Sequence, residues 1–107
     1  MTDFNDRERA EETKFARDEE MQFRIQARRN RLLGEWAARQ MGLTEVEAQS
    51  YAKDVVRADF EEAGDEDVIR KLLGDLTAAQ ADVSEADIRA KLEELTIEAR
   101  RQLLGGV

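Results

Sequence analysis

Apolar residues recur at helical spacing from Met21 onward and are almost absent before it. Between residues 21 and 41 they share one helical face, at separations of four, seven and eleven positions: Met21, Ile25, Leu32, Leu33, Trp36, Ala37 and Met41. In residues 1–20 the large apolar side chains besides the initiator Met1 are Phe4 and Phe15. The pattern predicts one long helix whose second half is buried and whose first half has little to bury.

Three shorter segments show the same spacing, and no run alternates as a strand would. The first runs from Glu45 to about Ala63 and ends at Gly64, the second from Glu66, after an Asp65 cap, to roughly Ala79, and the third from Glu85 to Leu104. Their predicted inward side chains are, in order, Ala48, Tyr51, Ala52, Val55, Val56 and Phe60; Val68, Ile69, Leu72, Leu73 and Leu76; and Ile88, Leu92, Leu95, Ala99 and Leu103.

Short signals mark the ends of these helices. Gly42 predicts a left-handed C-terminal end for the long helix, since glycine adopts positive φ at little cost. Thr44 with Glu47, and less strongly Ser84 with Asp87, have the spacing of capping boxes. The turn after the long helix is short, so the next helix should pack antiparallel to it.

Helix lengths then predict the architecture. At about 1.5 Å per residue a helix from Asp6 to Met41 spans roughly 54 Å, against about 30 Å for the second and fourth helices and about 20 Å for the third. The shorter helices cannot cover the long one. We therefore predict an all-α four-helix bundle over residues 21–107 and a polar N-terminal arm, residues 1–20, that protrudes or is mobile.

Composition excludes several function classes. The chain of 107 residues has no cysteine and no histidine, so thiolate nucleophiles, the usual general base and the histidines of a di-iron bundle are missing. The formal charge of -8 opposes nucleic-acid and anionic-membrane binding. We expect a cytoplasmic regulatory protein without a signal peptide, a membrane helix, a metal site or catalytic residues. We interpret the acids between residues 59 and 67 as groups that cap a helix N-terminus and keep the protein soluble.

The long helix concentrates basic charge within an acidic chain. Residues 21–41 carry five arginines against Glu35, a net +4, namely Arg24, Arg28, Arg29, Arg31 and Arg39. Guanidinium groups suit phosphate oxygens and Trp36 could stack on a base, which favours a nucleotide contact at Arg28, Arg29, Arg31 and Trp36. The other interpretation is a solvated face paired with acids of neighbouring helices, with Trp36 as a core or rim anchor.

The arm also has two interpretations. Its eight acids and four bases, net -4, are typical of a disordered tail. Phe4 and Phe15, however, are eleven residues apart and lie near one helical face, as the sparse anchors of a docking helix would.

Three blocks of the sequence identify a family. They are FARDEEMQFRIQARRNRLLGEWAA at residues 15–38, YAKDVVRADFEEAGDEDV at residues 51–68 and ADVSEADIRAKLEEL at residues 81–95, and DFNDRERAEETKF precedes them. The chain resembles the zeta subunit, the ATPase inhibitor subunit of alphaproteobacterial F-type ATP synthases. The resemblance implies a four-helix bundle whose N-terminal region inhibits ATP hydrolysis.

The resemblance also implies where the protein acts. The arm would enter a catalytic interface between the alpha and beta subunits, next to gamma, on the cytoplasmic face of the inner membrane, and would obstruct hydrolytic rotation. The inhibitory role falls on residues 4–20, with partner contacts expected from Phe4, Arg7, Arg9, Lys14, Phe15 and Arg17. Family members bind ADP or ATP on the bundle as a regulatory ligand, and no cofactor is required. The alternative function is a nucleotide-sensing helical adapter that acts on a different partner.

Overall fold

The computed structural model describes residues 3–58 and 65–105, and their side chains from residue 19 onward. Within these ranges the chain forms α1 (Asp3–Gln40), α2 (Glu45–Ala58), α3 (Glu66–Ala78) and α4 (Glu85–Leu103) and no strand. The predicted all-α fold is confirmed. No helix in the described ranges is long and apolar enough to cross a membrane.

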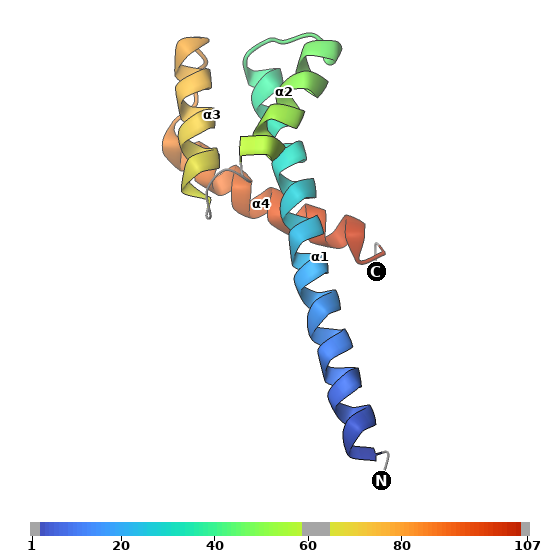
Figure 1. Cartoon of the computed structure of the whole chain (residues 1–107). Coiled ribbons are helices and arrows are strands. Elements are labelled where there is room, and N and C mark those ends of the chain that lie inside the picture. The colour runs from blue at the N-terminus through green and yellow to red at the C-terminus, as the bar shows by residue number, and fades with distance from the viewer. Residues whose placement is uncertain (1–2, 59–64, 106–107) are drawn as a thin grey trace.

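The long first helix is the axis of the molecule (Figure 1). Its 38 residues span about 57 Å at 1.5 Å per residue, and the molecule measures 66 × 28 × 24 Å. α2 packs beside the C-terminal half of α1, α4 crosses α1 near its middle, and the N-terminal half of α1 extends away from the other helices. The protruding arm is therefore confirmed as a backbone feature, and the boundary at residue 20 falls inside a continuous helix.

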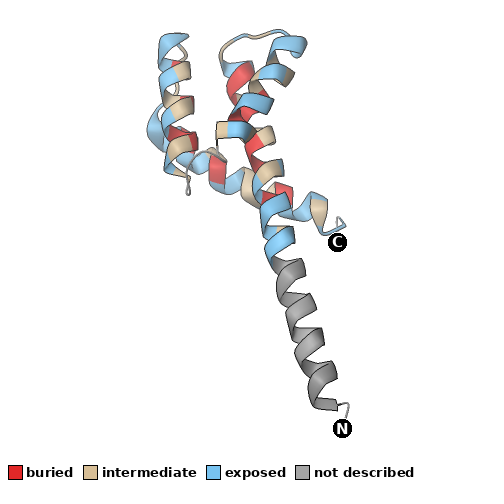
Figure 2. Ribbon diagram, viewed as in Figure 1, coloured by how far each residue is buried: buried red, intermediate tan, exposed pale blue. Residues whose placement is uncertain are grey.

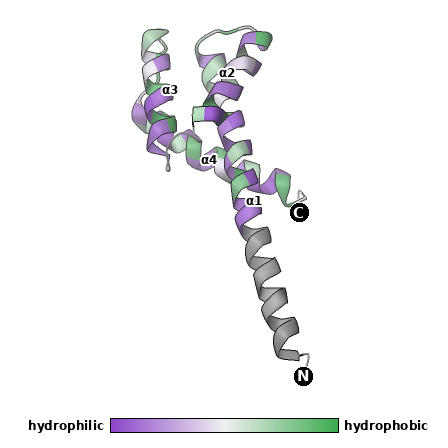
Figure 3. Cartoon of the chain, viewed as in Figure 1, coloured by the Kyte–Doolittle hydropathy of each residue, from purple (hydrophilic) through white to green (hydrophobic). Residues whose placement is uncertain are grey.

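One apolar core joins the four helices (Figure 2). The interleaved apolar and hydrophilic positions in Figure 3 are those of amphipathic helices. Most predicted inward residues are buried or half-buried, while Phe60 and the predicted end of the second helix at Ala63 and Gly64 lie outside the described residues. The fully buried large side chains are Leu33, Leu72, Leu76, Ile88, Val55, Val68 and Asn30.

The predicted caps at both ends of the first turn are confirmed. Gly42 has φ +74°, and the Leu43 N–H donates to the Ala38 carbonyl at 3.0 Å, which closes α1 with a left-handed turn. At the start of α2, the Thr44 and Glu47 side chains accept each other's backbone N–H groups at 3.2 and 2.9 Å. These bonds satisfy amides that a helix start leaves unpaired.

The two later helix starts differ from each other. Ser84 and Asp87 form a complete capping box at α4, as predicted. Asp65 is the N-cap residue of α3, as predicted, but its side chain makes no capping hydrogen bond. Its carboxylate instead accepts from Arg29 of α1 at 2.8 Å, because a buried guanidinium is a stronger donor than a solvated amide.

Candidate functional site

The arm and a basic pocket are the two candidate sites. All six residues predicted to contact a partner lie in the N-terminal half of α1, on helical backbone, and their side chains are outside those that the structure describes: Phe4, Arg7, Arg9, Lys14, Phe15 and Arg17. The structure thus gives the arm its direction and length, and the roles of these six side chains stay predictions.

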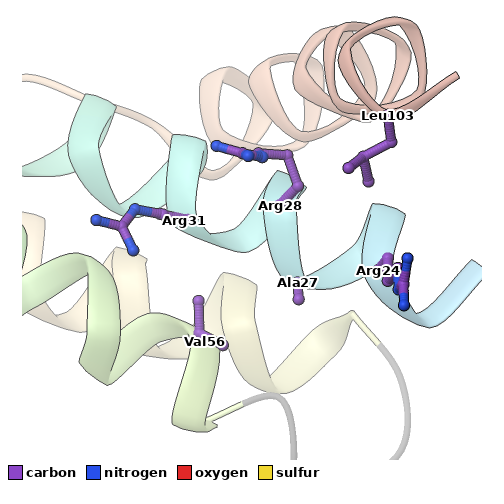
Figure 4. Close-up of a pocket in the computed structure, with 6 residues that line it drawn as sticks. All are labelled: Arg24, Ala27, Arg28, Arg31, Val56 and Leu103. Atoms are coloured by element: carbon purple, nitrogen blue, oxygen red, sulfur yellow. The ribbon is translucent and has the colours of Figure 1, made fainter. Parts of the chain in front are cut away.

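A pocket of about 490 Å³ lies where the arm meets the bundle (Figure 4). Arg24, Arg28 and Arg31 line it from successive turns of α1, at spacings of four and three residues. Val56 of α2 and Leu103 of α4 contribute apolar surface, together with Ala27. Pockets of roughly 300 to 1,000 Å³ hold small molecules, and guanidiniums beside apolar surface suit an anion that carries an organic group.

The three arginines differ in how far they are already occupied. Arg24 donates to Glu20 at 2.8 Å, and both side chains are more than half exposed. Arg31 donates to Gln49 at 2.7 Å and lies 3.5 Å from Glu35. Arg28 is exposed and makes no hydrogen bond or ion pair with any residue that the structure describes. Arg28 is therefore the arginine most ready to receive a ligand anion.

Arg29, predicted for the same site, faces the protein interior. It is 4% exposed, and its Nη2 donates to Asp65 at 2.8 Å and to Asn30 Oδ1 at 3.0 Å. Asn30 is fully buried, and its Nδ2 has no hydrogen-bond partner among the described residues. Arg29 ties α1 to the start of α3, and its charge is already compensated.

Trp36 is half-buried against the core and does not line the pocket. Lys91 of α4 lies 5.8 Å from its ring centroid, at cation–π distance. The structure therefore brings Arg28 and Arg31 together but separates them from Arg29 and Trp36.

The sequence analysis missed four residues that line the pocket, namely Arg24, Ala27, Val56 and Leu103. Arg24 could have been found, because residues 24, 28 and 31 share one helical face while residue 29 lies about 100° from residue 28 around the helix. Val56 and Leu103 carried no such signal, because only the packing of α2 and α4 against α1 brings them there.

A second polar cluster joins α2 to α3. The Tyr51 hydroxyl donates to Asp75 Oδ2 at 2.7 Å, and Lys71 donates to the same oxygen at 3.1 Å. Burial, and then the hydrogen bond to Asp75, raise the pKa of Tyr51 far above its ordinary value. A phenol held neutral in this way is a structural donor and not a nucleophile. No group of three or more acids suited to a metal ion occurs among the side chains that the structure describes.

Comparisons with known proteins add a family. The family profile described as ATPase inhibitor subunit zeta matches residues 1–102. A solved structure, described as the solution NMR structure of a protein, is 50% identical with a TM-score of 0.71, and the match covers 81% of this chain and 99% of that one. The comparison with curated proteins found no match.

Proposed function

This chain belongs to the ATPase inhibitor subunit zeta family, and from that premise we propose that it inhibits ATP hydrolysis by the F-type ATP synthase through its N-terminal arm. The observation that carries the proposal is the length of α1, whose N-terminal half extends beyond the bundle (Figure 1). The protein acts as a regulator and not as a catalyst.

The dimensions support insertion of the arm alone. A single helix with its side chains is about 10 to 12 Å wide, whereas the molecule is 24 to 28 Å across its shorter axes. A cleft between an alpha and a beta subunit, next to gamma, admits the helix and holds the bundle outside as a stop. Phe4 and Phe15 anchor the arm, and its bases orient it: Arg7, Arg9, Lys14 and Arg17. The complex forms on the cytoplasmic face of the inner membrane.

Deleting Thr2 to Phe15 tests the arm. The truncated protein should lose inhibition of ATP hydrolysis by the ATP synthase of its own host, because both aromatic anchors are gone. Its helical circular dichroism per residue and its thermal midpoint serve as folding controls. A truncated protein that still inhibits at the concentration of the full chain would remove the arm from the mechanism.

We further propose that the pocket beside the arm binds ADP or ATP as a regulatory ligand. Arg24, Arg28 and Arg31 contact the phosphates, and Val56 and Leu103 contact the nucleoside. This differs from the predicted set by using Arg24 in place of Arg29 and Trp36, because Arg29 is already paired with Asp65 and Trp36 is packed against the core.

A titration with ADP tests the pocket. Arg28→Gln should weaken binding about tenfold, since a hydrogen bond to a charged group contributes roughly 1.5 kcal/mol or more. Arg39→Gln is the matched control, because Arg39 is exposed on the same helix and does not line the pocket. Backbone NMR shifts that cluster away from residues 24–31, or equal affinities for the two variants, would reject this site.

The alternative is a nucleotide-sensing adapter that acts on a different partner. Arg28 has no partner among the described side chains, which favours a ligand under either function. Deleting the arm distinguishes the two functions. An adapter would keep its activity in the truncated protein, whereas an inhibitor would lose it.

A further inference from the structure

Arg24 belongs both to the pocket and to the root of the arm. It lines the pocket, and its Nη2 lies 2.8 Å from Oε1 of Glu20, the last residue of the arm. The two residues are one helical turn apart, so the pair spans the boundary between arm and bundle. Their side chains are 60% and 63% exposed, which leaves both able to exchange partners with solvent or a ligand.

A polyphosphate in the pocket would compete with Glu20 for Arg24. The three pocket arginines lie within eight residues of α1, and about 10 Å of helix separates the first from the last, which matches a chain of phosphates more closely than one phosphate. Arg28 offers free donors for the first contact, and a phosphate oxyanion then competes for the forked donors of Arg24. Glu20 carries one negative charge and a nucleotide carries several, so the ligand should displace it.

We propose that a polyphosphate in this pocket and the Glu20–Arg24 pair exclude each other, so that the bound ligand loosens the helical turn that joins the arm to the bundle. This inference rests on the proposed nucleotide binding. The coupling is reciprocal: if the ligand breaks the Glu20–Arg24 pair, the pair lowers the affinity of the pocket for the ligand by the same factor. An exposed ion pair at i,i+4 spacing changes the equilibrium constant for opening the helical turn by about twofold. The bound ligand and the Glu20–Arg24 pair should therefore weaken each other by about the same factor.

Glu35 provides a matched control for Glu20. Its Oε1 lies 3.5 Å from Nε of Arg31, also one helical turn away, but Glu35 lies C-terminal to the pocket arginines, within the bundle part of α1. Glu20→Gln and Glu35→Gln each remove one negative charge and one arginine ion pair beside the pocket, while Arg31 keeps its hydrogen bond to Gln49. Only Glu20→Gln removes an ion pair at the root of the arm.

The experiment titrates the full chain and both variants with ADP and, separately, with inorganic tripolyphosphate. NMR shifts at Arg28 report binding, and amide hydrogen exchange of residues 12–20 reports the arm. Both variants should bind each probe about twofold more tightly than the unmodified chain. Saturating ligand should speed exchange at residues 12–20 about twofold in the unmodified chain and in Glu35→Gln. In Glu20→Gln the ligand should leave that exchange unchanged, because the pair is already missing.

Each other outcome has a definite meaning. If ADP shifts Arg28 while exchange at residues 12–20 stays the same in the unmodified chain, or if Glu20→Gln binds no more tightly, the coupling is wrong and the nucleotide site stands. If neither probe binds, the proposed nucleotide site is wrong and the coupling is rejected with it, while the inhibition test of the arm is unaffected. Equal responses to both probes support the coupling and assign recognition to the phosphates alone.

Discussion

Single polar residues tie the helices together at defined points. Tyr51 of α2 and Lys71 of α3 share Asp75 Oδ2, and the Lys71 ammonium also lies 5.2 Å from the Tyr51 ring centroid. Arg89 of α4 forms two hydrogen bonds with Glu66 of α3, at 3.0 and 2.8 Å, and the hydrogen bonds from Arg89 lower the pKa of Glu66. The exposed Arg89–Glu66 pair contributes little to the free energy of unfolding, so its main effect is to fix the position of α3 relative to α4.

Tyr51 should make the bundle sensitive to alkali. Its pKa is raised in the folded protein, so its share of the stability is complete below the unfolded value of about 10 and is lost as the pH rises above it. Tyr51 is the one tyrosine of the chain, so tyrosinate absorbance reports this group alone. The absorbance should rise only as the protein unfolds.

Tyr51→Phe is the control for this alkaline effect. It should cost about 1 kcal/mol at neutral pH, for the lost hydrogen bond, and should reduce the fall in stability above about pH 10. Tyrosinate absorbance that appears near pH 10 while circular dichroism still shows a folded protein would contradict the prediction.

At the scale of the elements, the contact of α1 with α2 depends on a glycine. A Cβ added at Gly34 would lie 2.8 Å from the Ala52 Cα and 3.1 Å from Val55 Cγ2. The Ala52 atom is backbone and cannot rotate away, so the helices would have to separate. Gly34 is therefore needed for the close approach of the two helices.

Two glycine substitutions should have opposite effects. Gly34→Ala should destabilise the protein by about 1 to 3 kcal/mol, because the helices must move apart. Gly74→Ala should stabilise it by up to about 1 kcal/mol, because nothing lies within 4 Å of the added Cβ and alanine has the higher helix propensity. Urea unfolding measures the change in the free energy of unfolding for each variant. Equal changes at the two positions would show that packing against Ala52 and Val55 does not determine the effect of Gly34→Ala.

At the scale of the whole molecule, the bundle and the arm should contribute unequally to stability. The core joins residues of all four helices but includes nothing N-terminal to Leu33 among its buried members, and Ile25 is the first buried apolar side chain that the structure describes. The N-terminal half of α1 extends away from the other helices (Figure 1).

Deleting Thr2 to Phe15 should therefore leave the unfolding transition nearly unchanged. The urea m-value scales with the surface that unfolding newly exposes. Because the arm extends away from the other helices, its deletion should change that surface little. The midpoint and m-value of the truncated protein should equal those of the full chain within error. A clear fall in the m-value would show that the arm packs on the bundle in solution.

The sequence by itself determined the four helices, the capping boxes of α2 and α4 and the protruding arm. Those features depend on local propensity, helical periodicity and length, which are all written along the chain. The same periodicity separates residue 28 from residue 29, but it does not say which neighbouring helix covers which face. The sequence analysis therefore grouped Arg28 and Arg29 in one site.

Only the tertiary structure decided which arginines line the pocket. Packing of α3 places Asp65 against Arg29 and buries its charge, while the crossing of α4 places Leu103 beside Arg28 and leaves that guanidinium exposed. These contacts join residues more than 30 positions apart, so no local pattern encodes them. The physical reason is that burial and pairing of a side chain depend on its neighbours in space, whereas helix formation depends mainly on its neighbours in sequence.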